Sequence, residues 1–173
     1  MAWQKRLNSP PTSAVGRLFD GASSLLLDLH TASFEGQGPL QLEAMATAKG
    51  HAVSLELQRD AQGLYRTNWH PLIAMLTNPS RTKEQRAADF HASLAQALVA
   101  QVKQLSEHYS FDAVGLTGGV FQNRLLSKQI IKELARQGRT AYLPQRLPVN
   151  DGGLCYGQII ETVFLDKQQE GRA

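Results

Sequence analysis

Gly118 and Gly119 follow the short apolar run 112–116 after one residue, Thr117, and precede a helical pattern. In open α/β proteins, ligands bind beyond the carboxyl ends of the strands, where glycine lets the backbone approach a phosphate or a ribose. The helix that follows is expected to present free N–H groups to an anion. Because a Gly-Gly pair is equally typical of a tight turn that only packs, this pattern predicts either a nucleotide loop or a plain turn.

Two aspartates stand where a carboxylate could act on a ligand. Asp151 begins the last helical run within the sequence Asn150-Asp151-Gly152-Gly153. The local pattern favours a capping residue, and the alternative is an oxygen ligand for a metal ion near a phosphate. Asp20 lies at the margin of an apolar helical stripe. A solvated aspartate is the default there, and a hydrogen bond to a sugar hydroxyl is the functional alternative.

The remaining reactive side chains favour structural interpretations. No two of the five histidines are spaced to share a metal ion on one helix, so each is expected to be a surface or capping residue. The basic residues Arg124, Lys128, Lys132 and Arg136 recur every fourth position and predict a solvated helix face. The single cysteine, Cys155, excludes an internal disulfide and a Cys-rich zinc site, and is expected to pack in an apolar helix.

Composition predicts a soluble, cytoplasmic protein. The chain has 173 residues, 42% of them hydrophobic, and a net charge of +3, which is too small to indicate a nucleic-acid partner. No stretch reaches the roughly 20 apolar residues of a membrane-spanning helix, so no membrane contact is expected. The polar start runs into Pro10-Pro11 without the apolar region of a signal peptide. One free thiol fits a reducing compartment.

The elements that must position these residues are mainly helical in the first part of the chain. Residues 1–11 are expected to form a flexible lead-in, and residues 12–110 a helical part with a short hairpin. A helix is predicted from the cap types Thr12 and Ser13 to Leu29, and a break at 35–39 is expected before a second helix that ends near Gly50. Weak alternation over 52–68 predicts the hairpin, and the spacing over 81–109 predicts a long amphipathic helix.

Residues 111–173 predict a strand, helix, strand, helix unit that would bind a nucleotide. The strands are expected at 112–116 and 140–143, with a helix over about 120–137 between them. This order requires parallel strands. The fold class is therefore α/β, mainly helical, with a small parallel sheet. Two parallel strands make a thin sheet, so either more strands lie outside the chain or the helices pack largely on one another.

Four motifs, in order and spacing, resemble the HypF family of [NiFe]-hydrogenase maturation carbamoyltransferases. They are TSAVGRLFD at 12–20, FEGQ with LEA at 34–44, LTGGVFQNRLL at 116–126, and PVNDGG at 148–153. The resemblance runs from about Thr12 to the last helix. It implies the C-terminal part of a Kae1-like domain, which is a partial actin-like (ASKHA) ATPase lobe.

The resemblance also implies roles for particular residues. Nucleotide-sugar contacts correspond to Asp20, Gly36, Gly38 and Glu43, and the adenosine-side loop corresponds to Gly118, Gly119 and Asn123. Asp151 corresponds to a ligand of a divalent metal, which would be zinc, iron or magnesium. The positions of Gly38 and Glu43 shift by about one residue against the family pattern, because the turn here carries Gln37-Gly38-Pro39.

The implied reaction uses ATP and carbamoyl phosphate to make carbamoyl-adenylate and passes the carbamoyl group to the C-terminal cysteine of a HypE-type partner. No residue of the chain stands out as a general base. The paired His ligands of the metal belong to the first lobe of the domain in that family, and no His-x-x-x-His occurs here. The chain is therefore expected to be an excised fragment or a truncated gene product that needs the missing first lobe and is inactive alone.

Two alternatives stay open. One is a tRNA threonylcarbamoyltransferase of the Kae1 family, against which the wording GGVFQN and the modest charge argue. The other is a non-catalytic nucleotide-binding or interaction module.

Overall fold

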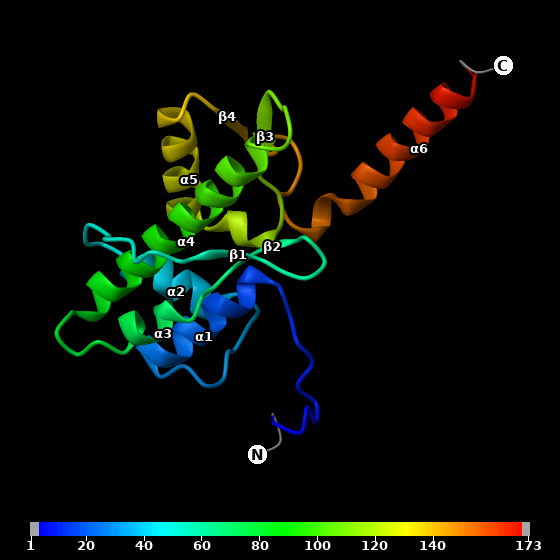
Figure 1. Cartoon of the computed structure of the whole chain (residues 1–173). Helices are drawn as coiled ribbons and strands as arrows, with labels where there is room; N and C mark the ends of the chain where they lie inside the picture. The colour runs from blue at the N-terminus through cyan, green and yellow to red at the C-terminus, as the bar shows by residue number, and fades with distance from the viewer. Residues whose placement is uncertain (1–3, 171–173) are drawn as a thin grey trace.

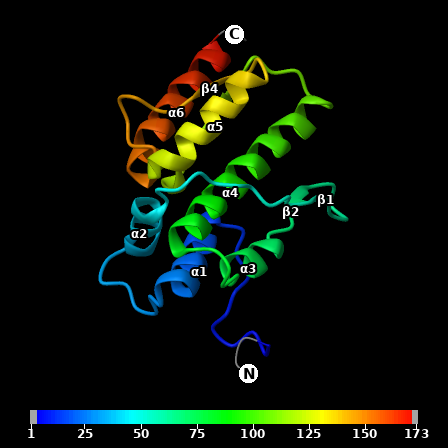
Figure 2. The ribbon, with the colours of Figure 1, turned by 90° about the vertical axis from the view of Figure 1, so that its left-hand side faces the viewer.

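The computed structural model describes residues 4–170, and a long helix, α4, connects its two halves. Toward the start of α4 (Lys83–Ser106) lie α1 (Val15–Leu27), α2 (Gln37–Met45) and α3 (Pro71–Leu76), and toward its end lie α5 (Arg124–Arg136) and the strands β3 (Ala113–Gly115) and β4 (Thr140–Tyr142). Figures 1 and 2 both show α4 running diagonally from the first group to the second. The helix α6 (Leu154–Glu170) follows a 3₁₀ turn at Asp151–Gly153.

The helix predicted over 81–109 is confirmed as α4, and its start is set by a capping box. The Thr82 hydroxyl accepts a hydrogen bond from Gln85 N (3.2 Å), and Thr82 N donates one to Gln85 Oε1 (3.0 Å). Its apolar face carries Phe90, whose ring meets that of Phe19 edge-on at 5.0 Å between centroids. Leu126, Ile130 and Leu134 of α5 complete the core.

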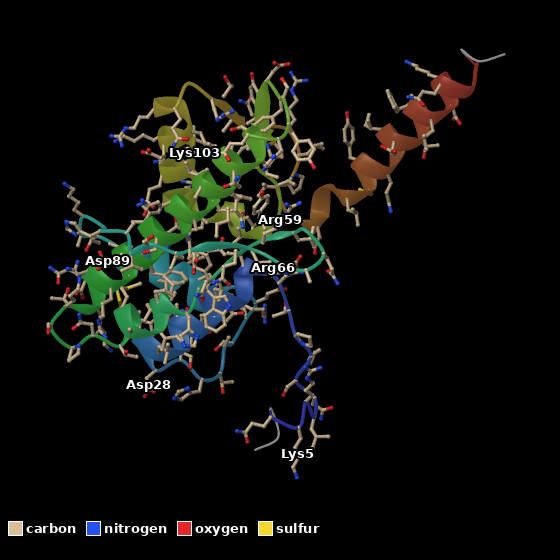
Figure 3. The ribbon with its side chains drawn as sticks, viewed as in Figure 1. Lys5, Asp28, Arg59, Arg66, Asp89 and Lys103 are labelled. Atoms are coloured by element: carbon tan, nitrogen blue, oxygen red, sulfur yellow. The ribbon has the colours of Figure 1, made fainter. Side chains whose placement is uncertain are left out.

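A buried aspartate ties the incoming chain to α4. Asp89, labelled in Figure 3, accepts a hydrogen bond from His51 N at 2.7 Å, and its other carboxylate oxygen lies 2.7 Å from Arg81 Nε. Val53 N donates to Ser93 Oγ two residues further along. These bonds hold residues 51–53 along α4 because a buried carboxylate is stable only when its oxygens are satisfied.

Both predicted strand pairs are confirmed. β1 (Leu57–Arg59) and β2 (Tyr65–Thr67) pair antiparallel, and Arg59 and Arg66 in Figure 3 mark this hairpin. β3 and β4 pair in parallel, with Val114 opposite Ala141, and α5 connects them. Val114 and Ala141 are half-buried, whereas Tyr142 is exposed. The helices therefore pack largely on one another around a thin sheet.

Helix boundaries differ from the prediction in three helices, which are α1, α2 and α5. α1 begins at Val15 after Ala14, and no side chain caps it, because the Thr12 hydroxyl accepts from Ala14 N instead. It ends at Leu27, where Asp28 adopts a left-handed conformation with φ +57°. α2 begins at Gln37, inside the expected break, and ends at Met45 rather than near Gly50. The helix after Gly119 begins as a 3₁₀ turn (Gly119–Gln122) before α5.

α6 extends away from the rest of the molecule (Figure 1). Its large apolar side chains are exposed, including Ile159 (61%) and Phe164 (56%). Cys155 is exposed as well, so the expectation that it packs in a helix interior is wrong. Within residues 4–170, no helix is both long enough and apolar enough to cross a membrane.

Candidate functional site

An open hollow of about 720 Å³ lies where β3 and β4 end and α6 begins. Cavities of a few hundred to about 1,000 Å³ are typical of small-molecule sites. Its walls come from the turn after β3, the 144–153 loop after β4, and the first turns of α6; they include Thr117, Gly118, Pro148, Asn150, Asp151, Tyr156 and Glu161. The two loops meet here because parallel strands place their carboxyl ends at the same edge of the sheet.

Gly118 shapes the floor of the hollow with its backbone. Its φ of +109° favours glycine over any residue with a side chain. Gly118 N donates to Val149 O at 2.7 Å, which joins the turn after β3 to the loop after β4. Gly119 begins the 3₁₀ turn and is not among the lining residues, and a side chain there would come within 3.9 Å of Asn150 Cβ. Of the residues expected around one concavity, Gly118 and Asp151 line the hollow, whereas Gly119 and Asp20 do not.

Asp151 is free of the capping role that its sequence position favours. The side chain of Asn150 performs that role by accepting from Gly152 N at 3.1 Å. Asp151 is exposed and lines the hollow, so its carboxylate is available to a ligand. The backbone on its other side is close-packed, because a side chain at Gly153 would meet Pro148 O at 2.6 Å.

The part of the chain that the structure describes does not form a metal site by itself. Residues 4–170 contain no group of three His, Cys, Asp or Glu side chains arranged to hold an ion. Asp151 and Glu161 are the carboxylates that line the hollow. A catalytic metal is usually held by about three protein ligands, so Asp151 would need donors from outside this chain.

The other predicted nucleotide contacts lie outside the hollow. Asp20 pairs with Arg17 at 3.1 Å on α1, and it is partly exposed. α1 contacts the 3₁₀ turn at Gly119–Gln122, so Asp20 belongs to the helix beside the glycine turn. Gly36 is exposed at the start of α2 with φ +82°. Gly38 is buried in α2, where a side chain would meet Ser23 Oγ at 2.6 Å.

The side chains of Glu43, on α2, and of Asn123, the N-cap of α5, both bond the start of α5. Glu43 Oε1 accepts from Leu125 N at 3.0 Å, and Asn123 Oδ1 accepts from Leu126 N at 2.8 Å. Two N–H groups expected to be free for an anion are therefore already bonded within the protein. The expectation that α5 presents these groups to a ligand is wrong. Both side chains therefore bond the first turn of α5.

Sequence reasoning missed His91. This residue is fully buried on α4, so its expected surface role is wrong. Its ring lies beside Asn123, with Asn123 Nδ2 2.9 Å from His91 Nε2. The position lies one residue after Phe90 and three before Leu94, within the apolar stripe of α4, which is the signal that could have identified it.

These features together define the class of protein. A parallel β–α–β unit with a glycine turn at the end of its first strand, packed on a helical half, is part of a Kae1-like domain. The chain belongs to the family described as "Carbamoyltransferase, Kae1-like Domain, second subdomain", whose model matches residues 1–158.

Known relatives agree with this assignment. The chain is 34% identical over 164 residues to carbamoyltransferase HypF of Synechocystis, and 37% identical over 158 residues to HypF of Rhodobacter capsulatus. These alignments cover 93% and 90% of this chain but 21% and 20% of the relatives. The chain therefore spans about a fifth of the length of these relatives.

A solved structure shares the fold. Full-length HypF in the phosphate- and nucleotide-bound form matches with a TM-score of 0.77 and 25% identity, over 84% of this chain and 20% of that one. HypF from T. kodakarensis matches with a TM-score of 0.69 over 90% of this chain and 20% of that one, at 22% identity, and supports the fold alone.

Proposed function

We propose that this chain forms one wall of the nucleotide site of a HypF-type carbamoyltransferase. The observation that carries the proposal is the hollow at the carboxyl ends of β3 and β4, where Gly118 offers its backbone and Asp151 an unused carboxylate. In open α/β folds, ligands bind at the carboxyl ends of the strands, which is this end of the sheet. The related full-length HypF with TM-score 0.77 is described as phosphate- and nucleotide-bound, which supports a nucleotide as the ligand class.

The parent reaction in this proposal is carbamoyl transfer. ATP and carbamoyl phosphate would give carbamoyl-adenylate, and the carbamoyl group would pass to the C-terminal cysteine of a HypE-type partner. The family assignment supports carbamoyl transfer. The residues of this chain would fix the position of the nucleoside, so that the reacting carbon is oriented for transfer. Asp20, Gly36, Gly38, Glu43, Gly119 and Asn123 would shape the nucleotide side of the site around Gly118.

Two further parts of the proposal require groups beyond this chain. Asp151 would contribute one ligand to a divalent metal, with the remaining donors supplied by the first subdomain of the Kae1-like domain. That subdomain would also form the second wall of the nucleotide site. The chain alone is accordingly expected to bind nucleotide no better than the millimolar range, about 4 kcal/mol of binding free energy, because a one-walled site leaves part of the ligand in water.

A nuclear magnetic resonance titration of the chain with ATP and magnesium tests the proposal directly. We expect amide shifts to concentrate at residues 117–119 and 149–154. Asp151→Asn should reduce the magnesium-dependent part of the response, whereas Asp166→Asn, an equal charge change further along α6, should leave it unchanged. Shifts confined to other regions, or micromolar affinity, would contradict the one-walled site.

Carbamoyl transfer is tested in a hybrid enzyme. Residues 12–158 of this chain replace the matching segment of Synechocystis HypF, and carbamoylation of the partner's cysteine thiol is followed by mass spectrometry. We expect the hybrid to transfer the group and the isolated chain to transfer none. A hybrid that folds and binds nucleotide without transfer would favour a binding-only module.

A further inference from the structure

His91 is a fully buried imidazole with both ring nitrogens in use. Nδ1 lies 2.8 Å from the carbonyl oxygen of Ala87, and Nε2 lies 2.9 Å from Asn123 Nδ2. A carbonyl oxygen can only accept a hydrogen bond, so Nδ1 must carry a proton. The amide of Asn123 is oriented independently, since its Oδ1 accepts from Leu126 N. Asn123 Nδ2 therefore donates to Nε2, and His91 is the neutral Nδ1–H tautomer.

Burial supports this neutral state. Loss of hydration lowers the pKa of His91 below its ordinary value of 6.5, against smaller opposing effects from the Ala87 carbonyl and from Glu43 on α2. A protonated imidazole would present an N–H to the N–H of Asn123. The hydrogen bond between Asn123 Nδ2 and His91 Nε2 can therefore form only when the imidazole is neutral.

Hydrogen bonds continue from Asn123 to the hollow. Asn123 N donates to Val120 O at 3.2 Å, Phe121 N donates to Gly118 O at 3.0 Å, and Gly118 N donates to Val149 O at 2.7 Å. Val149 lines the hollow next to Asn150 and Asp151. The only side chain that Asn123 contacts through Nδ2, among residues 4–170, is His91.

We propose that His91 is a positioning residue: its Nε2 holds the amide of Asn123, and Asn123 thereby fixes the Gly118–Gln122 turn at the edge of the hollow. This assigns the core of α4 a part in shaping the ligand site without any contact with the ligand. The consequence for nucleotide binding rests on the function proposed above, whereas the hold on the turn does not.

The tautomer of His91 in the unliganded chain provides the first test. Long-range ¹H–¹⁵N spectra of the imidazole should show a proton on Nδ1 and none on Nε2. Asn123→Asp keeps the oxygen that caps α5 but replaces the donor with a second oxygen, so in that variant Nε2 should gain a proton. A proton on Nε2 in the natural chain would overturn the proposal, because Asn123 could then not donate to it.

Amide hydrogen exchange provides the second test. His91→Phe keeps a ring but removes the acceptor, and we expect exchange at Phe121, Asn123 and Leu126 to rise roughly tenfold more than elsewhere in α5. His91→Gln restores an acceptor at about the same reach and should return most of the protection. Leu72→Ala, a buried position on α3, controls for general destabilisation. A uniform rise in His91→Phe that matches Leu72→Ala would show a merely structural role.

The nucleotide titration separates the two proposals. If the natural chain responds to ATP and magnesium, His91→Phe should weaken the response at residues 118–119, and His91→Gln should restore it. If the natural chain does not respond while the tautomer and the local exchange pattern are as expected, the nucleotide site fails and the positioning role stands. A normal response in His91→Phe would overturn the effect of His91 on the site.

Discussion

The start of α5 is neutralised from inside the protein. The carboxylate of Glu43 lies at the N-terminal end of the helix, where the helix dipole favours negative charge, and it bonds Leu125 N at 3.0 Å. A phosphate at this place would meet a carboxylate rather than free N–H groups. The N–H groups at the start of α5 are therefore not available to bind an anionic ligand.

Substitution of Glu43 separates its hydrogen bond from its charge. Glu43→Gln keeps an acceptor for Leu125 N and should cost about 0.3–1 kcal/mol of unfolding free energy through the lost charge–dipole interaction. Glu43→Ala also leaves Leu125 N without its partner and should cost about 1–3 kcal/mol. Denaturant unfolding of both variants checks the order, and equal losses would contradict the hydrogen-bonding role.

The buried imidazole predicts a pH dependence of stability. Because the pKa of His91 is lowered in the folded state, the unfolded chain binds a proton first as pH falls below 6.5. The stabilisation is complete above pH 6.5 and is lost as pH falls toward the folded-state pKa, by at most about 1.4 kcal/mol per pH unit. Denaturant unfolding between pH 5 and 7.5 measures this slope, and His91→Gln should be flatter than the natural chain. Equal slopes would contradict the assignment.

At the scale of elements, the packing of α1 on α2 depends on a glycine inside a helix. Gly38 lets α2 approach Ser23 of α1, because a side chain there would meet Ser23 Oγ at 2.6 Å and Ser23 Cβ at 2.7 Å. Gly21 of α1 has nothing within 4 Å of the corresponding point. Close packing therefore requires a glycine at position 38, whereas nothing in the packing requires one at position 21.

Alanine substitution should move stability in opposite directions at these two positions. Gly38→Ala should lower the melting temperature, at a cost of about 1–3 kcal/mol, because neither Ser23 nor the α2 backbone can move aside freely. Gly21→Ala should raise stability by roughly 0.5–1 kcal/mol, since alanine favours the helix and meets no neighbour. Thermal unfolding of both variants provides the measurement. A neutral Gly38→Ala would show that the helices can separate at little cost.

The elements with a strong local signal could be predicted from the sequence, and their contacts could not. Two local patterns predict elements that the structure has. One is the periodic apolar spacing of α4, and the other is the order of strand, Gly-Gly and helix at 112–137. Asn150, not Asp151, caps the 3₁₀ turn that leads into α6, and that choice depends on backbone geometry at a single peptide. His91 pairs with Asn123 across 32 residues, a separation at which local patterns carry no information.

At the scale of the whole molecule, α6 is a helix whose apolar residues do not pack into the core of the described structure. Its apolar residues Leu154, Ile159, Ile160, Val163, Phe164 and Leu165 are distributed around the helix rather than along one stripe, and all are exposed. A helix that is apolar on most sides is normally buried. The family description names a second subdomain, and the chain spans about a fifth of the Synechocystis and Rhodobacter relatives, so a preceding subdomain is the surface we expect α6 to contact.

Phe164→Ser distinguishes an unpartnered helix from a part of the core. In this chain the substitution should change the unfolding free energy by less than about 0.5 kcal/mol, because a side chain that is 56% exposed loses little burial. Phe90→Ser, at a position 1% exposed, should cost about 3–5 kcal/mol. In the hybrid with Synechocystis HypF, extended to carry residues 12–170, Phe164→Ser should instead destabilise the protein measurably. Amide exchange of α6 should be fast in the isolated chain and slowed in the hybrid. If α6 exchanges equally fast in both, the preceding subdomain does not cover it, and the two-walled nucleotide site would need its second wall from another part of the protein.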